Sequence, residues 1–365
     1  MRAGTGSTLE AAVADTVGAK VVELEDVISS DLDYDAFLAH RDLRRVSGIA
    51  VTAAGRLPWS LIEKMTAGPA LASAYLVDNG RRERAAYCSG LLDELPVGVR
   101  APALRGVDER PDGEIVLRLE DVRQDGEGAT GEGSIVGVAR DLGLLSGTWL
   151  GRHTEEHWLF RGWIERHAQP GAQVAGREAL RRAHPAALDR LGSRLDLGVS
   201  LIDAQPRIAA LLDSLPQTLC HHDAVGANVL RCEGVTVLID WESVGPGAVG
   251  ADLASLLFSS ARRGDCSARL VARCFEAAVM AYADGIRQTG ADIDVASVRL
   301  GVDAAIALRW KLLFDLAVAL EQGTPVRRGS APQEGSDAAT DELVLLSGIL
   351  EAAADRVLGL KSPMV

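Results

Sequence analysis

The residues with the clearest chemical potential lie in one run between positions 219 and 242. An apolar stretch there leads to Asp223, Asn228 follows five residues later, and a second apolar stretch leads to Asp240. Phosphoryl transfer needs such a set, because one carboxylate accepts the proton of an attacking hydroxyl while an amide oxygen and a second carboxylate hold Mg²⁺ on the nucleotide phosphates. An Asp after a strand is by itself a common turn former, so only the three residues together indicate this chemistry.

The run resembles the aminoglycoside phosphotransferase and choline kinase family, whose members have a kinase-like pair of lobes. The shared motifs are H-x-D-x₄-N at 221–228, IDWE at 239–242 and GADLA at 250–254. The resemblance implies that Asp223 is the catalytic base and that Asn228 and Asp240 bind Mg²⁺ on a bound ATP or GTP.

The same resemblance implies supporting roles for neighbouring side chains. His221 is expected to brace the catalytic loop, and Asp252 to hold that loop from the following helix. Glu242 is expected to reach the metal or the substrate. His222 stands where the family often has a small residue, and it is expected either to face the substrate or to pack.

Upstream of this run, the same chemistry requires a strand lysine and a helical glutamate that positions it on the nucleotide phosphates. Lys64 and Glu83 are the predicted pair, in a strand-like and a helix-like segment that resemble the family's. Lys20 is the competing lysine, and an edge-strand surface charge is the alternative for Lys64. Glu63 is a competing acid, expected on the opposite face of its strand.

Segment 119–122 resembles the hinge between the lobes, where the backbone around Glu120 and Val122 would contact the adenine. No clear glycine-rich loop over the phosphates precedes the lysine. The nearest candidates are 46–48 and 53–56.

The order of predicted elements indicates an α+β fold of two unequal lobes, and the resemblance implies that they form a bilobal fold as in protein kinases. We expect a small β-rich N-lobe over 1–122 that binds nucleotide, a flexible linker over 123–133, and a larger, mainly helical C-lobe over 134–365, with the ligand crevice between the lobes. Strands are predicted over 20–24, 42–52, 59–65, 114–122, 218–221 and 235–240. Helices are predicted near the N-terminus, with a cap at Ser7, and over 81–92, 134–152, 154–167, 177–192, 203–214, 250–262, 268–288, 294–322 and 340–358.

Composition excludes several other classes of protein. The chain is 47% hydrophobic, which is typical of a globular protein, and it carries 51 acidic against 38 basic residues, so a nucleic-acid partner is not expected. No apolar segment is long enough to suggest a membrane partner. Five cysteines without a C-x-x-C pair favour a reducing, cytoplasmic location. The oligomeric state is not indicated.

Two further motifs suggest other functions. G-x-G-x-x-G at 126–131 carries acidic neighbours, so we interpret it as a linker rather than a dinucleotide site. H-x-x-E-H at 153–157 would fit a zinc hydrolase if it lay on a helix. A non-catalytic nucleotide-binding regulator is the other alternative.

The acceptor is expected to be a small molecule. Asp252 comes only twelve positions after Asp240, which leaves no room for the activation segment of a protein kinase. We therefore predict an O-phosphotransferase that acts on a hydroxyl of an antibiotic or related natural product. An acidic pocket would suit a cationic acceptor, and Trp158, Trp163 and Trp310 are candidates to line it.

Overall fold

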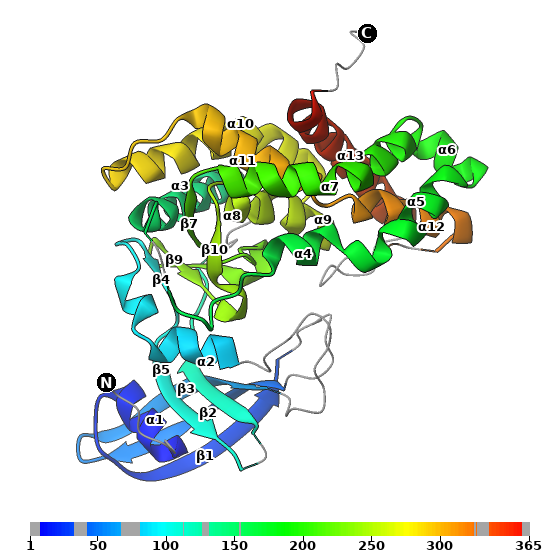
Figure 1. The fold of residues 1–365 in the computed structure, drawn as a ribbon. Helices are drawn as coiled ribbons and strands as arrows, with labels where there is room; N and C mark the ends of the chain where they lie inside the picture. The colour runs from blue at the N-terminus through cyan, green and yellow to red at the C-terminus, as the bar shows by residue number, and fades with distance from the viewer. Residues whose placement is uncertain are drawn as a thin grey trace. The chain divides into compact units, whose positions relative to one another are not determined.

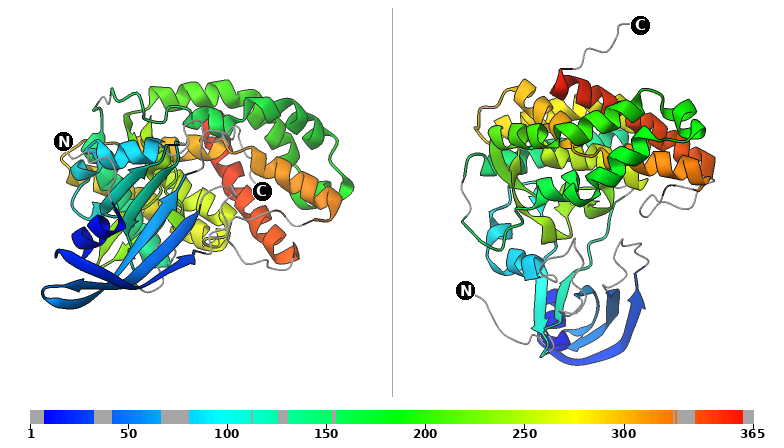
Figure 2. Two further views of the ribbon diagram at one scale, coloured as in Figure 1. Left: turned by 90° about the horizontal axis from the view of Figure 1, so that it is seen from below. Right: turned by 45° about the vertical axis from the view of Figure 1, so that its right-hand side comes forward.

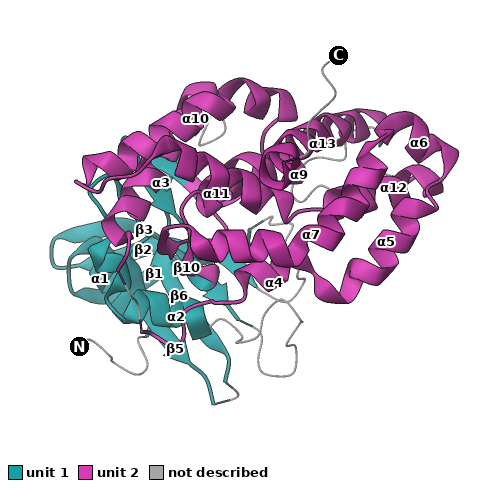
Figure 3. Ribbon diagram, turned by 45° about the horizontal axis from the view of Figure 1, so that its top comes forward, with its two compact units in different colours: residues 1–126, 230–242 teal, residues 127–229, 243–365 magenta. Residues whose placement is uncertain are grey.

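The computed structural model describes residues 8–32, 42–66, 81–111, 113–125, 131–152, 155–324, 326 and 336–359. The chain divides into two compact units (Figure 3). Unit 1 comprises residues 1–126 and 230–242, and unit 2 comprises residues 127–229 and 243–365. The chain therefore returns to unit 1 after its first passage through unit 2, a crossing that the linear domain prediction does not contain.

Unit 1 is built on a five-stranded antiparallel sheet in the order β1-β2-β3-β6-β5 (Figures 1 and 2). Its strands are β1 (Val21–Asp31), β2 (Leu43–Thr52), β3 (Gly55–Met65), β5 (Leu104–Glu109) and β6 (Ile115–Glu120). Helix α2 (Arg81–Cys88) follows β3 in the sequence. The returning segment adds a second sheet in the order β4-β9-β8, from β4 (Val99–Arg100), β9 (Val235–Leu238) and β8 (Val229–Cys232).

Helix α1 (Leu9–Val17) covers one face of the larger sheet (Figure 1). Its buried Val13 packs in one cluster with Trp59 and Leu61 of β3, which removes apolar surface from water. The cap lies one residue later than predicted, because the Thr8 hydroxyl accepts the Ala11 N–H at 3.3 Å. Ser7 lies outside the described residues.

Among its described residues, unit 2 is mainly helical, with one short antiparallel pair of strands, β7 (Gln217–Cys220) and β10 (Gly245–Ala248). Its helices are α3 (Glu132–Trp149), α4 (Trp163–Ala168), α5 (Gln173–Arg181), α6 (Pro185–Leu191), α7 (Arg194–Ser214), α8 (Ala251–Ala254), α9 (Ser260–Arg263), α10 (Ala268–Gln288), α11 (Val295–Ala307), α12 (Lys311–Gln322) and α13 (Ser336–Leu358). None of the described helices combines the length and the apolar character that crossing a bilayer requires.

Close packing of α3 against α10 depends on glycine. A Cβ added at Gly143 would lie 2.1 Å from the carbonyl oxygen of Tyr282, and one at Gly285 would lie 2.0 Å from that of Arg140. Both distances are far shorter than any real contact, so larger residues would push the two helices apart.

The single helices predicted over 177–192 and 294–322 are wrong, because each region forms two helices in the structure. Pro185 cannot continue a helix from the preceding turn, so α5 ends and α6 begins there. The second prediction breaks between α11 and α12, where Arg309 bonds to Ser255 and Ser259 from a different part of unit 2. That break is imposed by tertiary contacts, because the local sequence contains no helix-breaking residue.

Candidate active site

The loop after β7 is held by one buried carboxylate. Asp252 accepts the backbone N–H of His221 at 2.8 Å and that of His222 at 2.7 Å. Burial raises the pKa of Asp252 to about 6, while these two hydrogen bonds favour its charged form. The contact is the one that the predicted loop-holding role of Asp252 requires.

The two histidines of this loop have different surroundings. The ring of His221 accepts the N–H of Asp223 through Nδ1 at 3.3 Å, which ties the ring to the loop that it is expected to brace. His222 has a φ of 64°, in the left-handed region that a histidine rarely adopts. Its ring stacks on Trp163 at 5.1 Å, and Nε2 lies 3.0 Å from the carbonyl oxygen of Pro246. His222 therefore packs.

Asp223 and Asn228 lie in direct contact. The amide nitrogen Nδ2 of Asn228 donates to Oδ2 of Asp223 at 2.8 Å and to its carbonyl oxygen at 2.9 Å. The other amide atom, Oδ1 of Asn228, is buried and has no hydrogen-bond partner among the described residues. A buried acceptor without a donor is costly unless something fills its coordination, and an amide oxygen suits a divalent cation. This side chain therefore fits the predicted metal role.

In unit 1, Lys64 meets two carboxylates. Its Nζ lies 2.7 Å from Oε2 of Glu83 and 2.5 Å from Oδ1 of Asp240. Glu83 lies on α2 and is fully buried, and burial raises its pKa while the Lys64 ammonium opposes the shift. The lysine and glutamate paired from the sequence thus form an ion pair. Their contact with nucleotide stays a prediction.

The competing residues are placed elsewhere. Lys20 is exposed just before β1. Oε1 of Glu63 accepts Nε of Arg118 at 2.8 Å, from its cross-strand neighbour on β6. Successive strand residues alternate between faces, and Glu63 and Lys64 accordingly have different partners.

The predicted hinge is fixed by its acidic side chains. Glu120 accepts a bidentate pair from Arg100 at 2.7 and 2.9 Å, and Asp121 accepts one from Arg45 at 2.8 and 3.0 Å. The N–H of Glu120 donates to Ala103, and that of Val122 donates to the carbonyl of Glu120. A contact between adenine and the Val122 N–H therefore requires that last hydrogen bond to open.

Glu242 lies in unit 1, and its negative charge contributes to raising the pKa of Glu83. It is therefore electrostatically linked to the lysine cluster, while its predicted contact with metal or substrate stays a prediction. The neighbouring Trp241 is fully buried and donates to the carbonyl of Leu238 at 2.7 Å.

The zinc motif does not form the helix that it needs. The helix predicted over 154–167 is confined to α4, and residues 155–162 are not helical. His153 lies outside the described residues, as do 126–130 of the glycine motif and the predicted linker.

Three further side chains lie near this loop: one tryptophan that the sequence analysis named and two arginines that it did not. Arg309 is 7% exposed, Trp163 stacks on His222, and Arg166 lies with its guanidinium carbon 4.2 Å from the ring centre of Phe160. Trp163 was a candidate for the acceptor pocket, and the arginines were not. Trp310 is fully buried and donates its indole N–H to a backbone carbonyl, so it belongs to the core. Trp158 donates to Glu156.

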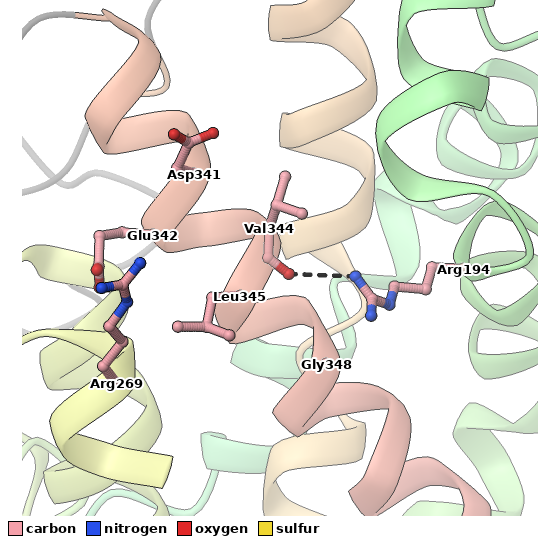
Figure 4. A pocket seen from close by; sticks show the side chains of 7 residues that line it. All are labelled: Arg194, Arg269, Asp341, Glu342, Val344, Leu345 and Gly348. Atoms are coloured by element: carbon pink, nitrogen blue, oxygen red, sulfur yellow. Dashed lines mark hydrogen bonds between the residues drawn. The ribbon is translucent and has the colours of Figure 1, made fainter.

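A hollow elsewhere in unit 2 contains none of these residues (Figure 4). It lies at α13 and is lined by Arg194, Arg269, Asp341, Glu342, Val344, Leu345 and Gly348. Arg194 donates to the carbonyl of Val344 at 3.2 Å, and Glu342 accepts the N–H of Ala268. These groups are thus engaged in holding helices together.

Comparison with known proteins agrees with this geometry. A profile of the phosphotransferase enzyme family matches residues 36–288. An aminoglycoside phosphotransferase from Alicyclobacillus acidocaldarius subsp. acidocaldarius DSM 446 has a similar structure, with a TM-score of 0.55 and 13% identity over 98% of this chain and 97% of that one. No curated protein matches the chain.

Two further solved structures are similar. A choline kinase from Cryptosporidium parvum Iowa II has a TM-score of 0.52 and 13% identity, covering 92% of each chain. An amicoumacin kinase, solved with AMP-PNP, Ca²⁺ and Ami, has a TM-score of 0.51 and 15% identity, covering 96% of this chain and 94% of that one. At these identities the likeness concerns the fold, and it confirms the predicted kinase-like α+β class.

Proposed function

The chain belongs to the phosphotransferase enzyme family and is a small-molecule kinase, and we propose that it transfers the γ-phosphoryl group of ATP or GTP to a hydroxyl of its acceptor with the help of Mg²⁺. The observation that carries the proposal is the contact between Asn228 and Asp223. It leaves a carboxylate to receive a proton and a buried amide oxygen to bind a cation.

In the proposed reaction the acceptor oxygen attacks the γ-phosphorus while the bond to the β,γ-bridging oxygen breaks. The acceptor proton passes to the carboxylate of Asp223, and the nucleoside diphosphate leaves with the bridging oxygen. Lys64 contributes a compact positive charge for the phosphates, and Glu83 holds it in place. When bound, Mg²⁺ neutralises charge on the phosphates, and Asn228 and Asp240 are the residues that would hold it.

We infer an antibiotic or related natural product as the acceptor. Support comes from the structural likeness to an aminoglycoside phosphotransferase and an amicoumacin kinase. The choline kinase likeness keeps a simple amino alcohol as an alternative. The cytoplasmic location favoured by the cysteine content stays a prediction.

Nucleotide binding is the first test. Thermal unfolding of the protein with Mg·ATP, Mg·GTP or Zn²⁺ separates a kinase from a zinc enzyme, because a ligand at 100 times its Kd adds about 2.7 kcal/mol to the unfolding free energy. We expect stabilisation by a magnesium nucleotide. Stabilisation by Zn²⁺ alone would contradict the proposal.

Transfer is the second test, measured by mass spectrometry on a panel of aminoglycosides, macrolides, nucleosides and amino alcohols. A nucleotide-dependent gain of one phosphoryl group by any member supports an enzyme. Nucleotide binding without transfer to any member would favour the non-catalytic regulator instead.

A further inference from the structure

A buried cation lies at the break between α11 and α12. Arg309 donates from Nε to the hydroxyl of Ser259 at 3.2 Å, from Nη2 to that of Ser255 at 3.3 Å, and from Nη1 to the carbonyl of Ala305. All three acceptors are uncharged. Within the described part of the chain, none of the ion pairs includes Arg309. Its positive charge is thus taken out of water without an ion-pair partner among the residues that the structure describes, which is unusual for a buried charge.

The segment that holds Arg309 also holds the catalytic loop. Ser255–Ser259 forms a π-helical turn, a rare feature that is frequent at functional sites. The next residue, Ser260, accepts the N–H of Gly226 in the loop at 2.8 Å. One short segment therefore fixes both the guanidinium and the loop that carries Asp223.

Aromatic stacking gives a second geometric connection between Arg309 and the loop. The guanidinium carbon of Arg309 lies 5.6 Å from the ring centre of Trp163. The same ring stacks on His222 at 5.1 Å, and His222 directly precedes Asp223 in the sequence. Arg309 and His222 therefore lie against the same indole ring.

Charged groups of both signs surround this stack. Burial lowers the pKa of Arg309 to about 9, and Asp223 is the carboxylate that opposes this shift. Burial also lowers the pKa of His167, with Arg309 and Arg166 adding to the effect. Two guanidinium groups and two carboxylates therefore lie near this stack, and the second carboxylate, that of Asp252, is already bonded to the N–H groups of His221 and His222. A pocket made for a polycation would need an excess of carboxylates, which these four groups do not provide.

We propose that Arg309 binds an anionic group of the acceptor, and that the acceptor is a hydroxylated molecule bearing a carboxylate or a similar acidic group rather than a polycation. This inference rests on the proposed kinase function and differs from the expectation of an acidic pocket. A planar guanidinium suits a carboxylate because it offers parallel N–H donors. Since only 7% of Arg309 is exposed, an anion bound there is shielded from water. Hydrogen bonds between charged groups are stronger in such surroundings than in water.

The test compares acids with their uncharged amides as acceptors. Gluconate with gluconamide, and glycerate with glyceramide, are supplied with saturating Mg·ATP, and ethanolamine and kanamycin serve as cationic probes. Release of ADP is measured for the wild type. We expect the acids to exceed their amides roughly tenfold or more in kcat/KM, because the buried charge is left unpaired by an amide. Equal or better use of amides or cations, or no use of any acid, would overturn the inference.

Variants then assign the preference to one residue. Arg309→Gln should reduce the acid-to-amide ratio to about one, and Arg309→Lys should retain part of it. Arg273→Gln makes the same change at an exposed position on α10 and should leave the ratio unchanged. An unchanged ratio in Arg309→Gln would also overturn the inference. If that variant does not fold, the wild-type ratio and Arg309→Lys still decide.

The experiments distinguish a failure of the proposed kinase function from a failure of this inference. Loss of the proposed function would appear as absence of stabilisation by any magnesium nucleotide. Nucleotide binding with transfer that favours amides or cations would leave the kinase proposal intact and remove only the acidic acceptor.

Discussion

The ammonium group of Lys64 lies 2.5 Å from a carboxylate oxygen of Asp240, although the two are 176 positions apart in the sequence. Glu83 approaches the same ammonium at 2.7 Å. One positive charge is therefore shared by two carboxyl groups in a largely buried part of unit 1. The contact depends on the return of the chain through β9, which brings Asp240 back to the unit that contains β3.

Lys64→Met should destabilise the protein by about 3 kcal/mol, because removing one partner leaves buried acids without a counter-charge. The double variant Lys64→Met/Glu83→Gln should recover part of this loss. Urea unfolding measures both free energies. Lys20→Met, at an exposed position, serves as the control and should change the free energy by less than about 0.5 kcal/mol. A single Lys64 variant as stable as the wild type would show that the cluster is not held by charge.

Gly247→Ala should slow catalysis without touching a predicted catalytic residue. A Cβ at Gly247 would lie 2.4 Å from Cε1 of His222 and 3.0 Å from Sγ of Cys220, so the ring must move. We expect kcat to fall roughly 10- to 100-fold, because Asp223 follows His222 and small misplacements at a reacting centre are costly. Nucleotide affinity should change little.

The matched control for that substitution is Gly137→Ala in the middle of α3. A Cβ there meets no atom within 4 Å. It should leave kcat unchanged and stabilise the protein by about 0.5–1 kcal/mol, because alanine favours a helix more than glycine does. Equal kcat in both variants would contradict a role for the His222 packing.

Stability should fall below neutral pH because of His222. Burial lowers its pKa to about 3, with the carbonyl of Pro246 opposing and Arg166 adding to the effect. The unfolded chain binds this proton near pH 6.5, so the contribution of His222 is fully present above pH 6.5 and is lost as the pH falls toward 3. At pH 5.5 the loss from this residue is about 1.4 kcal/mol.

Urea unfolding at pH 7.5 and pH 5.5 measures this effect. His222→Gln should show a smaller difference between the two pH values than the wild type does, whatever its absolute stability. His157→Gln, at an exposed position, should keep the wild-type difference. An identical difference in all three proteins would mean that His222 is protonated without unfolding.

The short-range part of the candidate site was predictable from sequence. Asp223 and Asn228 were predicted to belong to one site, and because they are only five residues apart, one turn of loop brings them into contact. The Lys64–Glu83 pair was predicted only through the family resemblance, because no local pattern links a strand lysine to a helix beyond a turn.

Arg309 could not be predicted, and the reason is physical. Its partners Ser255 and Ser259 lie about fifty residues away on a π-helical turn. No hydrophobic periodicity in the sequence predicts such a turn. The break beside it was missed for the same cause, since tertiary hydrogen bonds override the helical propensity of 294–322. Likewise, β1 extends to Asp31 rather than ending at residue 24, because pairing with β2 stabilises its exposed half.

The most direct measurement compares wild type with Asp223→Asn for both phosphoryl transfer and nucleotide binding. The substitution keeps the size of the side chain and an oxygen that can accept from Asn228, but it removes the proton acceptor. We predict that kcat falls roughly 10²- to 10⁴-fold while the Kd for Mg·ATP stays within about threefold. Wild-type turnover in Asp223→Asn would contradict the account.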